Sequence, residues 1–377
     1  MHNDIQVRIK GEHYLNRTLA LTEEDSGMNG YKVIYTSWGE EKPVLSMGTK
    51  HTGFELYDAK KNIYRVYVGE GRQTRQAYFN GVRGIRSRSV AGLANPKIDV
   101  DAGHYISADT QLLNYAHPER IEMILKANWC HSKLAMNDVK DNGDGTVTIT
   151  PVNEIWKPAT YRFKGFSDHR RFPTHLENAY EFVDEPGEWY LESDDGMMYY
   201  IPREGDDMST MEVTVPKVEQ LLTITGADYE KRAKRIVFDN IEFSYTDNAR
   251  PFRTGGWSGS QNGIYEESSV EVPPHAVTVK NARNIEFTNN KFSHMVSGAL
   301  LTHDSIQFCN IVGNEFVDLG GNAINLGLYS DARDTHTPEA LNTNNRVENN
   351  YIHHIAVEHQ SSVGIAACWP RHTTISH

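Results

Sequence analysis

Four short segments in the C-terminal half of the chain repeat one pattern, an Asn followed closely by an aromatic or aliphatic residue, and this repeat constrains the fold most. The segments cover residues 236–243, 285–292, 306–316 and 347–352. Asn290 and Asn314 are 24 residues apart, about one turn of a parallel β-helix. The longer steps from Asn240 to Asn290 and from Asn314 to Asn350 indicate polar loops inserted between turns, the first of them at 246–273.

Stacking explains why this pattern predicts a solenoid. Each turn contributes short strands whose apolar residues point inward, and one turn cannot bury its own apolar face. An inward Asn at a bend can bond the backbone and the Asn of the next turn, which makes a ladder. An immunoglobulin-like sandwich is the alternative, and the recurring Asn disfavours it. We therefore predict an all-β fold, a right-handed parallel β-helix with an inserted β-sandwich-like module.

The chain divides into three parts by the presence or absence of the repeat. Residues 105–210 alternate short strands with turn signals and show no repeat, and they end in a predicted hairpin at 188–202. We predict a β-helix start at 1–104, the inserted module at 105–210 and a β-helix core at 211–377. Both ends fall in strand-like sequence, so we expect further turns beyond residue 377 in the natural protein.

The charge balance argues against a polyanionic partner. The chain has 50 Asp and Glu against 38 Lys and Arg, a formal net charge of −12, whereas phosphate binding needs clustered basic residues. No run of 18 apolar residues is present, so no membrane span is predicted. Cys130, Cys309 and Cys368 cannot all pair within one chain and form no CxxC motif. None of these observations argues against a neutral glycan as the partner.

Neither a cofactor nor a metal is predicted. The cluster of His353, His354 and His359 lacks a defined spacing of carboxylate and His ligands. The polar start of the sequence shows no apolar stretch typical of a signal peptide. Because the N-terminus reads as incomplete, we expect a secreted or periplasmic protein, with the cytoplasm as the alternative.

A second column of residues follows the stacked repeat. Tyr245, His294, Asp318 and His354 come just after the aromatic or aliphatic position of their turns. Equivalent positions of neighbouring turns lie about 4.8 Å apart, so His294, Asp318 and His354 are predicted to form a polar stripe along one face. A carboxylate between two imidazoles indicates a site, and a solvated stripe of turn residues is the competing interpretation.

Cleavage of a glycosidic bond usually needs two carboxyl groups, one as acid or base and one as nucleophile or base. Asp318 is the first candidate, and Glu358, at the following bend, is its predicted partner. Asp304 is the reserve candidate. Asp331 and Asp334 lie in a predicted loop, where a surface role or the rim of a cleft is expected.

Seven residues are predicted to bind the sugar, because they lie on the polar stripe, near small-residue strands or in a Gly-rich loop. They are Trp257, His294, His303, Asp304, Asn325, His354 and Trp369. The Gly-rich stretch 255–261 does not follow a strand and open a helix, which disfavours phosphate binding and leaves a substrate-lining loop. For any single aromatic residue, packing in the core is the competing explanation.

Several segments resemble the β-helical glycoside hydrolases of families 141 and 120, the former more closely. They cover residues 21–27, 78–83, 187–191, 198–203, 313–324 and 349–354. The order of parts, a β-helix start, an inserted β-sandwich and a β-helix, matches as well. The resemblance implies action on plant polysaccharides, with xylosidase, xylanase or fucosidase activity, through paired acidic residues on the β-helix face. It supports Asp318 most directly.

Two other functions stay open. A polysaccharide lyase on the same fold needs a Lys or Arg base, usually with calcium, and the last turns offer few basic residues beyond Arg333, Arg346 and Arg371. A non-catalytic adhesin or carbohydrate-binding β-helix is the third class, since a fold does not fix a function.

Overall fold

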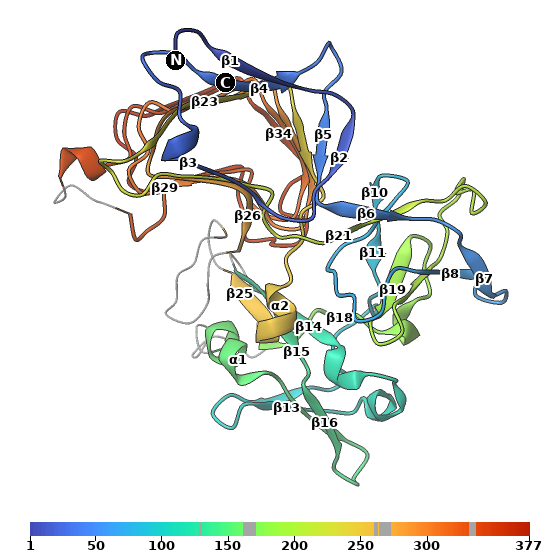
Figure 1. Cartoon of the computed structure of the whole chain (residues 1–377). Coiled ribbons are helices and arrows are strands. Elements are labelled where there is room, and N and C mark those ends of the chain that lie inside the picture. Colours follow the sequence, from blue (N-terminus) through green and yellow to red (C-terminus); the bar gives the residue numbers. More distant parts are fainter. Residues whose placement is uncertain (128–129, 161–170, 260–262, 264–272, 332–336) are drawn as a thin grey trace.

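Three parallel sheets run through both the N-terminal and the C-terminal parts of the chain. The computed structural model describes residues 1–127, 130–160, 171–259, 263, 273–331 and 337–377. The three sheets are the walls of a coil, and the main apolar core fills its interior (Figure 1). Both termini lie on the same wall of the coil (Figure 1). The all-β class predicted from the sequence is confirmed.

Strands that succeed one another along the chain belong to the first, the second and the third sheet in turn. The first sheet contains β1 (Ile5–Ile9), β4 (Val33–Ser37), β23 (Ala233–Asp239), β27 (Ala282–Thr288), β30 (Asn310–Val312), β33 (Arg346–Glu348) and β36 (Thr374–Ser376). The second sheet contains β2 (Glu12–Tyr14), β5 (Val44–Ser46), β24 (Glu242–Ser244), β28 (Lys291–Met295), β31 (Glu315–Leu319) and β34 (Tyr351–His353). The third sheet contains β3 (Leu19–Thr22), β22 (Leu222–Thr225), β26 (His275–Lys280), β29 (Gly298–His303), β32 (Ile324–Leu326) and β35 (Ile365–Ala367).

All neighbouring strands within these three sheets are parallel. Each turn of the coil therefore lies directly on the next, and residues far apart in the sequence become neighbours along a wall. The right-handed sense of the predicted β-helix stays a prediction.

The coil is interrupted at the corner between the second and third sheets. Strands β6 (Gly48–His51) and β21 (Val213–Pro216) pair antiparallel there. The chain between them, residues 52–212, is called the insertion below, and it packs beside the coil (Figure 1). Its antiparallel sheets start at β7 (Glu55–Asp58), ahead of residue 105, where the sequence placed the module.

The insertion consists mainly of short antiparallel strands. After β7 come β8 (Ile63–Tyr67), β9 (Tyr78–Phe79), β10 (Val82–Arg83), β11 (Ile85–Arg86), β12 (Lys97–Asp99), β13 (His104–Ser107), β14 (Glu122–Ala127), β15 (Cys130–Ala135), β16 (Asp138–Asp141), β17 (Val147–Thr150), the helix α1 (Asn153–Thr160), β18 (His175–Glu177), β19 (Glu188–Glu192) and β20 (Met197–Tyr200). Strands β19 and β20 form the hairpin predicted at 188–202.

A second excursion leaves the same corner one turn later. Between β24 and β26 the chain forms the helix α2 (Arg250–Thr254) and the strand β25 (Gly256–Gly259), and β25 pairs antiparallel with β15 of the insertion. The next turn of the coil thus donates a strand to the insertion. The predicted loop at 246–273 does leave the coil at this point, although most of 260–272 lies outside the described residues.

Stacked asparagines join successive turns, as predicted. Asn314 Oδ1 accepts a hydrogen bond from the backbone N–H of Asn290 at 2.9 Å, and Asn350 Oδ1 accepts one from Asn314 N–H at 3.0 Å. The prediction for Asn240 was wrong by one position. Ile241 occupies the ladder place and donates its N–H to Asn290 Oδ1 at 3.0 Å, while Asn240 adopts the left-handed φ of 56° that Asn tolerates well.

The aromatic position of the repeat builds the core. Phe243, Phe292 and Phe316 are fully buried, and their stacked ring centroids lie 5.0 and 4.6 Å apart. Ile352 continues the column in the next turn. Burying one side chain of this size stabilises the fold by about 1.5–3 kcal/mol. The alignment of the four segments on this position is confirmed.

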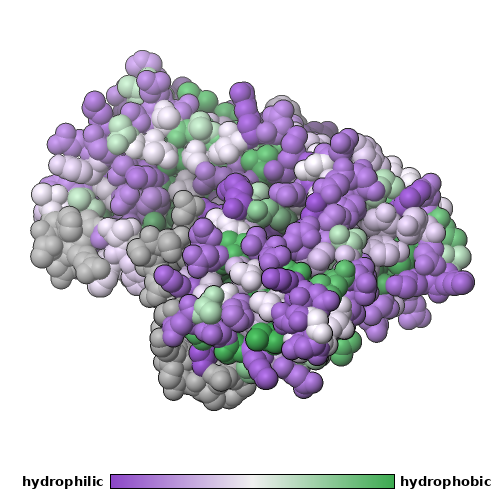
Figure 2. All heavy atoms as spheres, turned by 90° about the horizontal axis from the view of Figure 1, so that it is seen from below, coloured by the Kyte–Doolittle hydropathy of each residue, from purple (hydrophilic) through white to green (hydrophobic). Residues whose placement is uncertain are grey.

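The surface shows no broad apolar area on the side seen from below. Hydrophilic residues dominate that side, and hydrophobic ones form small separate patches (Figure 2). In the described part of the chain, no helix is long and apolar enough to cross a membrane. Cys130, Cys309 and Cys368 are buried.

Candidate functional site

The outer face of the third sheet carries polar side chains in register. Along β26, Val277 and Val279 are fully buried in the core, whereas Thr278 and Lys280 alternate with them on the outer face, as the two-residue period of a strand requires. His303 lies beside Lys280 in the next turn. Side chains from different turns therefore meet at this end of the sheet.

Asp304 and Asp331 form a pair of carboxyl groups there. Asp304 follows β29 with φ 51°, and its carboxylate lies 3.1 Å from Lys280 Nζ and 3.3 Å from His303 Nδ1. Asp331 Oδ2 accepts hydrogen bonds from Asp304 N–H at 3.1 Å and from Asn342 Nδ2 at 2.6 Å. One nitrogen of His303 and one oxygen of each carboxyl group lie within 4.8 Å of one another.

The surroundings shift the two pKa values in opposite directions. The hydrogen bond with His303 is the main reason that the pKa of Asp304 lies well below its usual value, and Lys280 adds to this lowering. Burial raises the pKa of Asp331, whose Oδ1 has no hydrogen-bond partner within the described ranges. The side chain of Asp304 is 39% exposed and that of Asp331 is 1% exposed. The surroundings thus push the pKa values of two neighbouring carboxyl groups apart, and acid–base catalysis uses such pairs.

Exposed aromatic residues lie on the turn next to this pair. Trp369 is 42% exposed and Tyr329 is 39% exposed, and Trp369 Nε1 donates to the Tyr329 carbonyl at 3.2 Å. Gly327 allows the chain around Trp369 to approach Asp331 closely. A Cβ at position 327 would meet the Cys368 carbonyl at 2.3 Å and Asp331 Oδ2 at 3.1 Å. Rings with an apolar face and a polar edge suit stacking against a sugar.

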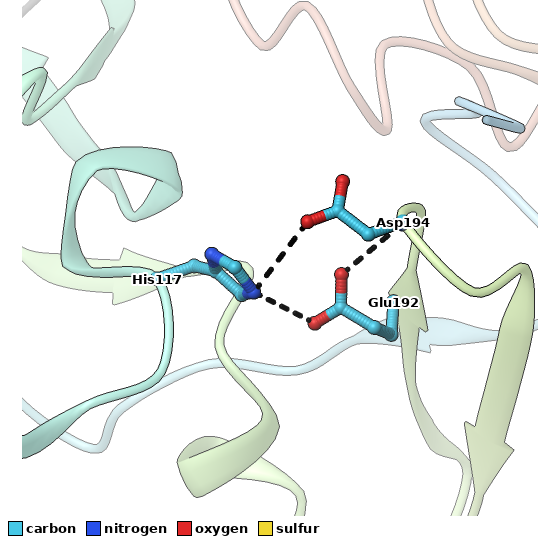
Figure 3. Close-up of side chains that lie close together, drawn as sticks. All are labelled: His117, Glu192 and Asp194. Carbon is cyan, nitrogen blue, oxygen red and sulfur yellow. Dashed lines mark hydrogen bonds and ion pairs between the residues drawn. The ribbon is translucent and has the colours of Figure 1, made fainter.

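Two clusters offer donor atoms of the kind that bind metal ions. The first is the group of His303 with the two carboxyl groups, in which Lys280 already pairs with Asp304. The second lies in the insertion and joins His117, Glu192 and Asp194 (Figure 3). Arg120 contacts Glu192 at 3.0 Å and Asp194 at 2.8 Å. Lys280 thus pairs with one carboxylate of the first cluster, and Arg120 pairs with both carboxylates of the second.

Residues 66–203 match the family model of the GH141 insertion domain. The chain carries a GH141 insertion domain. Over 97% of its length the chain also matches a solved structure titled "Glycoside hydrolase", with a TM-score of 0.80, 22% identity and 68% of that chain covered. A second structure, titled "The complex structure of XylC with xylose", matches with a TM-score of 0.45, 12% identity and 96% and 50% coverage. No curated protein sequence is similar enough to count as a match.

The GH141 insertion domain confirms the resemblance to family 141, and the shared fold agrees with it. The match of residues 66–203 supports a glycoside hydrolase. The domain contains the residues that dock against the coil at the corner where the insertion leaves it. These contacts involve both carboxylates that the sequence nominated for catalysis.

Asp318 lies in the predicted column and binds an arginine of the GH141 insertion domain. Tyr245, His294, Asp318 and His354 share left-handed φ values of 49–61° at the corner of four turns, so the column is present. Asp318 Oδ1 lies 2.6 Å from Arg83 Nε, and Asp318 Oδ2 lies 2.8 Å from His294 Nδ1. Burial raises the pKa of Asp318, but the contacts with His294 and Arg83 lower it more, so the net shift is downward.

Glu358 makes a second, deeper contact with the same domain. Its side chain is 5% exposed and accepts hydrogen bonds from Arg75 Nε at 2.7 Å, Gln76 Nε2 at 2.9 Å and Lys133 Nζ at 3.2 Å. Arg75 is also paired with Glu122 at 2.7 Å. Burial opposes ionisation, yet Lys133 and Arg75 together keep the pKa of Glu358 well below its usual value. Both predicted catalytic carboxylates are thus ion-paired across the interface, and their catalytic role stays a prediction.

The predicted sugar-binding residues separate into two groups. His303, Asp304 and Trp369 lie around the carboxyl pair, and Asn325 lies on the same face, buried and bonded to Asn322 at 2.7 Å. His294, His354 and Trp257 lie elsewhere. His294 contacts Asp318, and His354 is exposed beside His353 at 2.7 Å.

The prediction that Trp257 lies in an exposed loop was wrong. Trp257 is 6% exposed because β25 pairs with the insertion and because its ring packs 4.4 Å from that of His359. Sequence reasoning placed Asp331 only at a rim, and it did not single out Lys280. No motif marks these two residues, whereas Arg83 lies inside a segment that resembles family 141. Asp334 lies outside the described residues.

Proposed function

We propose that the chain hydrolyses glycosidic bonds of a plant-type polysaccharide or oligosaccharide, with xylosidase, xylanase or fucosidase-like specificity, and that Asp304 and Asp331 are the paired carboxyl groups. The reaction takes place on the outer face of a right-handed parallel β-helix. One observation carries the proposal: two carboxyl groups within 4.8 Å have pKa values shifted apart by their surroundings. The acidic net charge of the chain and a secreted or periplasmic location fit a neutral glycan substrate.

The chemistry follows from the protonation states. Asp331, whose pKa is raised, is the proposed acid that gives its proton to the leaving oxygen, whereas Asp304, whose pKa is lowered, is half-exposed and attacks the sugar carbon as that oxygen departs. The oxygen–oxygen distance belongs to the short class of carboxyl separations, which favours a covalent glycosyl intermediate on Asp304 and retention of configuration. Water then breaks the bond between Asp304 and the sugar, and Asp331, which has given up its proton, takes a proton from that water. Lys280 and His303 keep Asp304 ionised, and Trp369 offers an exposed ring for stacking.

The experiment measures turnover of aryl xylosides, aryl fucosides and xylo-oligosaccharides by the full chain and by Asp304→Asn and Asp331→Asn. Each variant is expected to lose about 10²–10⁴-fold in kcat, while the exposed Asp138→Asn in the insertion serves as the matched control. Asp318→Asn, in the same panel, tests the assignment made from sequence. Product mass and stereochemistry are read by mass spectrometry and NMR.

Three results contradict the proposal. An unsaturated product identifies a lyase, and binding without any turnover identifies a carbohydrate-binding module. Full activity in both Asp304→Asn and Asp331→Asn, together with loss of activity in Asp318→Asn, shows that Asp318 and not the proposed pair is catalytic.

A further inference from the structure

A pocket of about 390 Å³ lies where the coil, α2 and the GH141 insertion domain meet. We call it the junction pocket, and its walls include Ile155, Asn248, Pro251, Trp257, Pro273 and His359. Its volume falls in the range of small-ligand sites, which is about 300–1,000 Å³. None of the residues assigned to the carboxyl pair lines it.

Two polar groups on its wall are buried and lack partners. Trp257 is 6% exposed and His359 is 3% exposed. Trp257 Nε1 and His359 Nε2 have no hydrogen-bond partner in the described part of the chain. A buried donor without a partner is unfavourable, so their occurrence together on the wall of one pocket indicates a ligand that supplies the missing hydrogen bonds.

The chemistry of these groups favours an uncharged ligand with hydroxyl groups. Burial lowers the pKa of His359 to about 3, so the imidazole is neutral at ordinary pH and its nitrogen can donate or accept. The indole N–H of Trp257 only donates. Ile155, Pro251 and Pro273 supply apolar wall. Arg250 and Arg253 also line the pocket. Arg250 already has an interaction partner in the protein, and the side chain of Arg253 is 61% exposed and pairs with Glu219 at 3.6 Å.

The pocket and the carboxyl pair lie near opposite ends of one strand. His275, at the start of β26, shares a small hollow with His359, and Lys280, at the end of β26, contacts Asp304. Five residue steps along a strand span about 16 Å. A chain of several sugar units can therefore reach from one site to the other along the outer face of the third sheet.

We propose that the junction pocket binds an uncharged pyranose unit of the substrate, with hydrogen bonds from Trp257 Nε1 and with His359 Nε2. The proposal rests on the proposed carbohydrate function but not on the identity of the catalytic carboxyl groups.

The test measures binding of xylose and L-fucose to the full chain by tryptophan fluorescence and calorimetry. The wild type is expected to bind at least one of them saturably. Trp257→Phe and His359→Leu each remove one hydrogen bond and are expected to weaken binding about 2- to 10-fold. His359→Gln keeps a donor and an acceptor and is expected to bind more tightly than His359→Leu. Trp38→Phe, at a 60% exposed tryptophan, is the control.

Asp304→Asn separates the two proposals, because it is expected to lose turnover and to bind the monosaccharide like the wild type. If Asp304→Asn retains full turnover while Trp257→Phe weakens binding, the assignment of Asp304 as a catalytic residue is wrong, whereas the proposal of sugar binding in the junction pocket is supported. Thermal melting confirms that each variant is folded. If Trp257→Phe does not fold, the binding measured for the two His359 variants tests the proposal. The pocket proposal is overturned if the wild type binds neither sugar, if His359→Leu binds like the wild type, or if glucuronate binds more tightly than both sugars.

Discussion

Replacing Glu358 with Gln separates a structural role of this carboxylate from a catalytic one. The substitution keeps the size of the side chain and removes the charge that faces Arg75 and Lys133 at 2.7 and 3.2 Å. Disrupting a buried ion pair from one side costs about 3–5 kcal/mol. With an unfolding entropy of about 2.1 cal/mol/K per residue, a chain of 377 residues is expected to melt about 4–6 °C lower.

The effect depends on pH in a definite direction. The folded-state pKa of Glu358 lies below its unfolded value, so its ionisation contributes stability that is present above the unfolded pKa of about 4.3 and is lost as the pH falls towards the folded one. The gap in melting temperature between wild type and Glu358→Gln is therefore expected to be largest near pH 7 and to shrink below pH 4.

Circular dichroism melting at several pH values is the assay. Glu286→Gln is the matched control, because Glu286 pairs with Lys32 at 2.8 Å near the surface, with side chains 20% and 40% exposed. Such a pair contributes about 1 kcal/mol or less, so the control is expected to melt within about 1 °C of the wild type. A Glu358→Gln protein that melts like the wild type but has lost turnover refutes this reasoning and restores Glu358 as a catalytic residue.

Three further predictions follow from other groups. Asn314→Ala removes four hydrogen bonds of the ladder and is expected to lower the free energy of unfolding in urea by about 3 kcal/mol, whereas Asn240→Gly, off the ladder, changes it by less than about 1 kcal/mol. Burial raises the pKa of Asp247 to about 6, so the wild type loses stability as the pH rises from the unfolded pKa of about 4 to about 6. Asp247→Asn is therefore expected to gain up to about 3 kcal/mol over the wild type at pH 8 and little at pH 4. An equal difference at both pH values contradicts the assignment. In the pH dependence of kcat/KM, Asp331→Asn is expected to lack the alkaline limb and Asp304→Asn the acidic limb.

The sequence predicted the stacking of the coil because inward positions recur at a fixed spacing. Phe243, Phe292 and Phe316 mark one column, and a register error would have moved each of them out of the core. The slip at Asn240 has a local cause: the Asn-Asn pair before Phe292 offers two possible partners. Asn240 is three residues before its Phe, like Asn289 rather than Asn290.

The site was less accessible from sequence because its partners come from segments without a repeat. The stripe of His294 and Asp318 is present, but the arginine that binds it lies 235 residues away from Asp318 in the insertion. No pattern in the sequence predicts that Arg83 contacts Asp318. Asp331 belongs to an irregular loop and becomes notable only through its burial next to Asp304.

The antiparallel pairing of β6 and β21 has a consequence for how this architecture can change over time. Gly48 faces Pro216 and His51 faces Val213, so the long excursion departs and returns through one narrow neck. Residues 52–212 can therefore be lengthened, exchanged or deleted while the strands of the three parallel sheets keep their order. Deletion has one cost, because it removes the guanidinium groups that pair with Asp318 and Glu358 and leaves Asp318 with His294 alone.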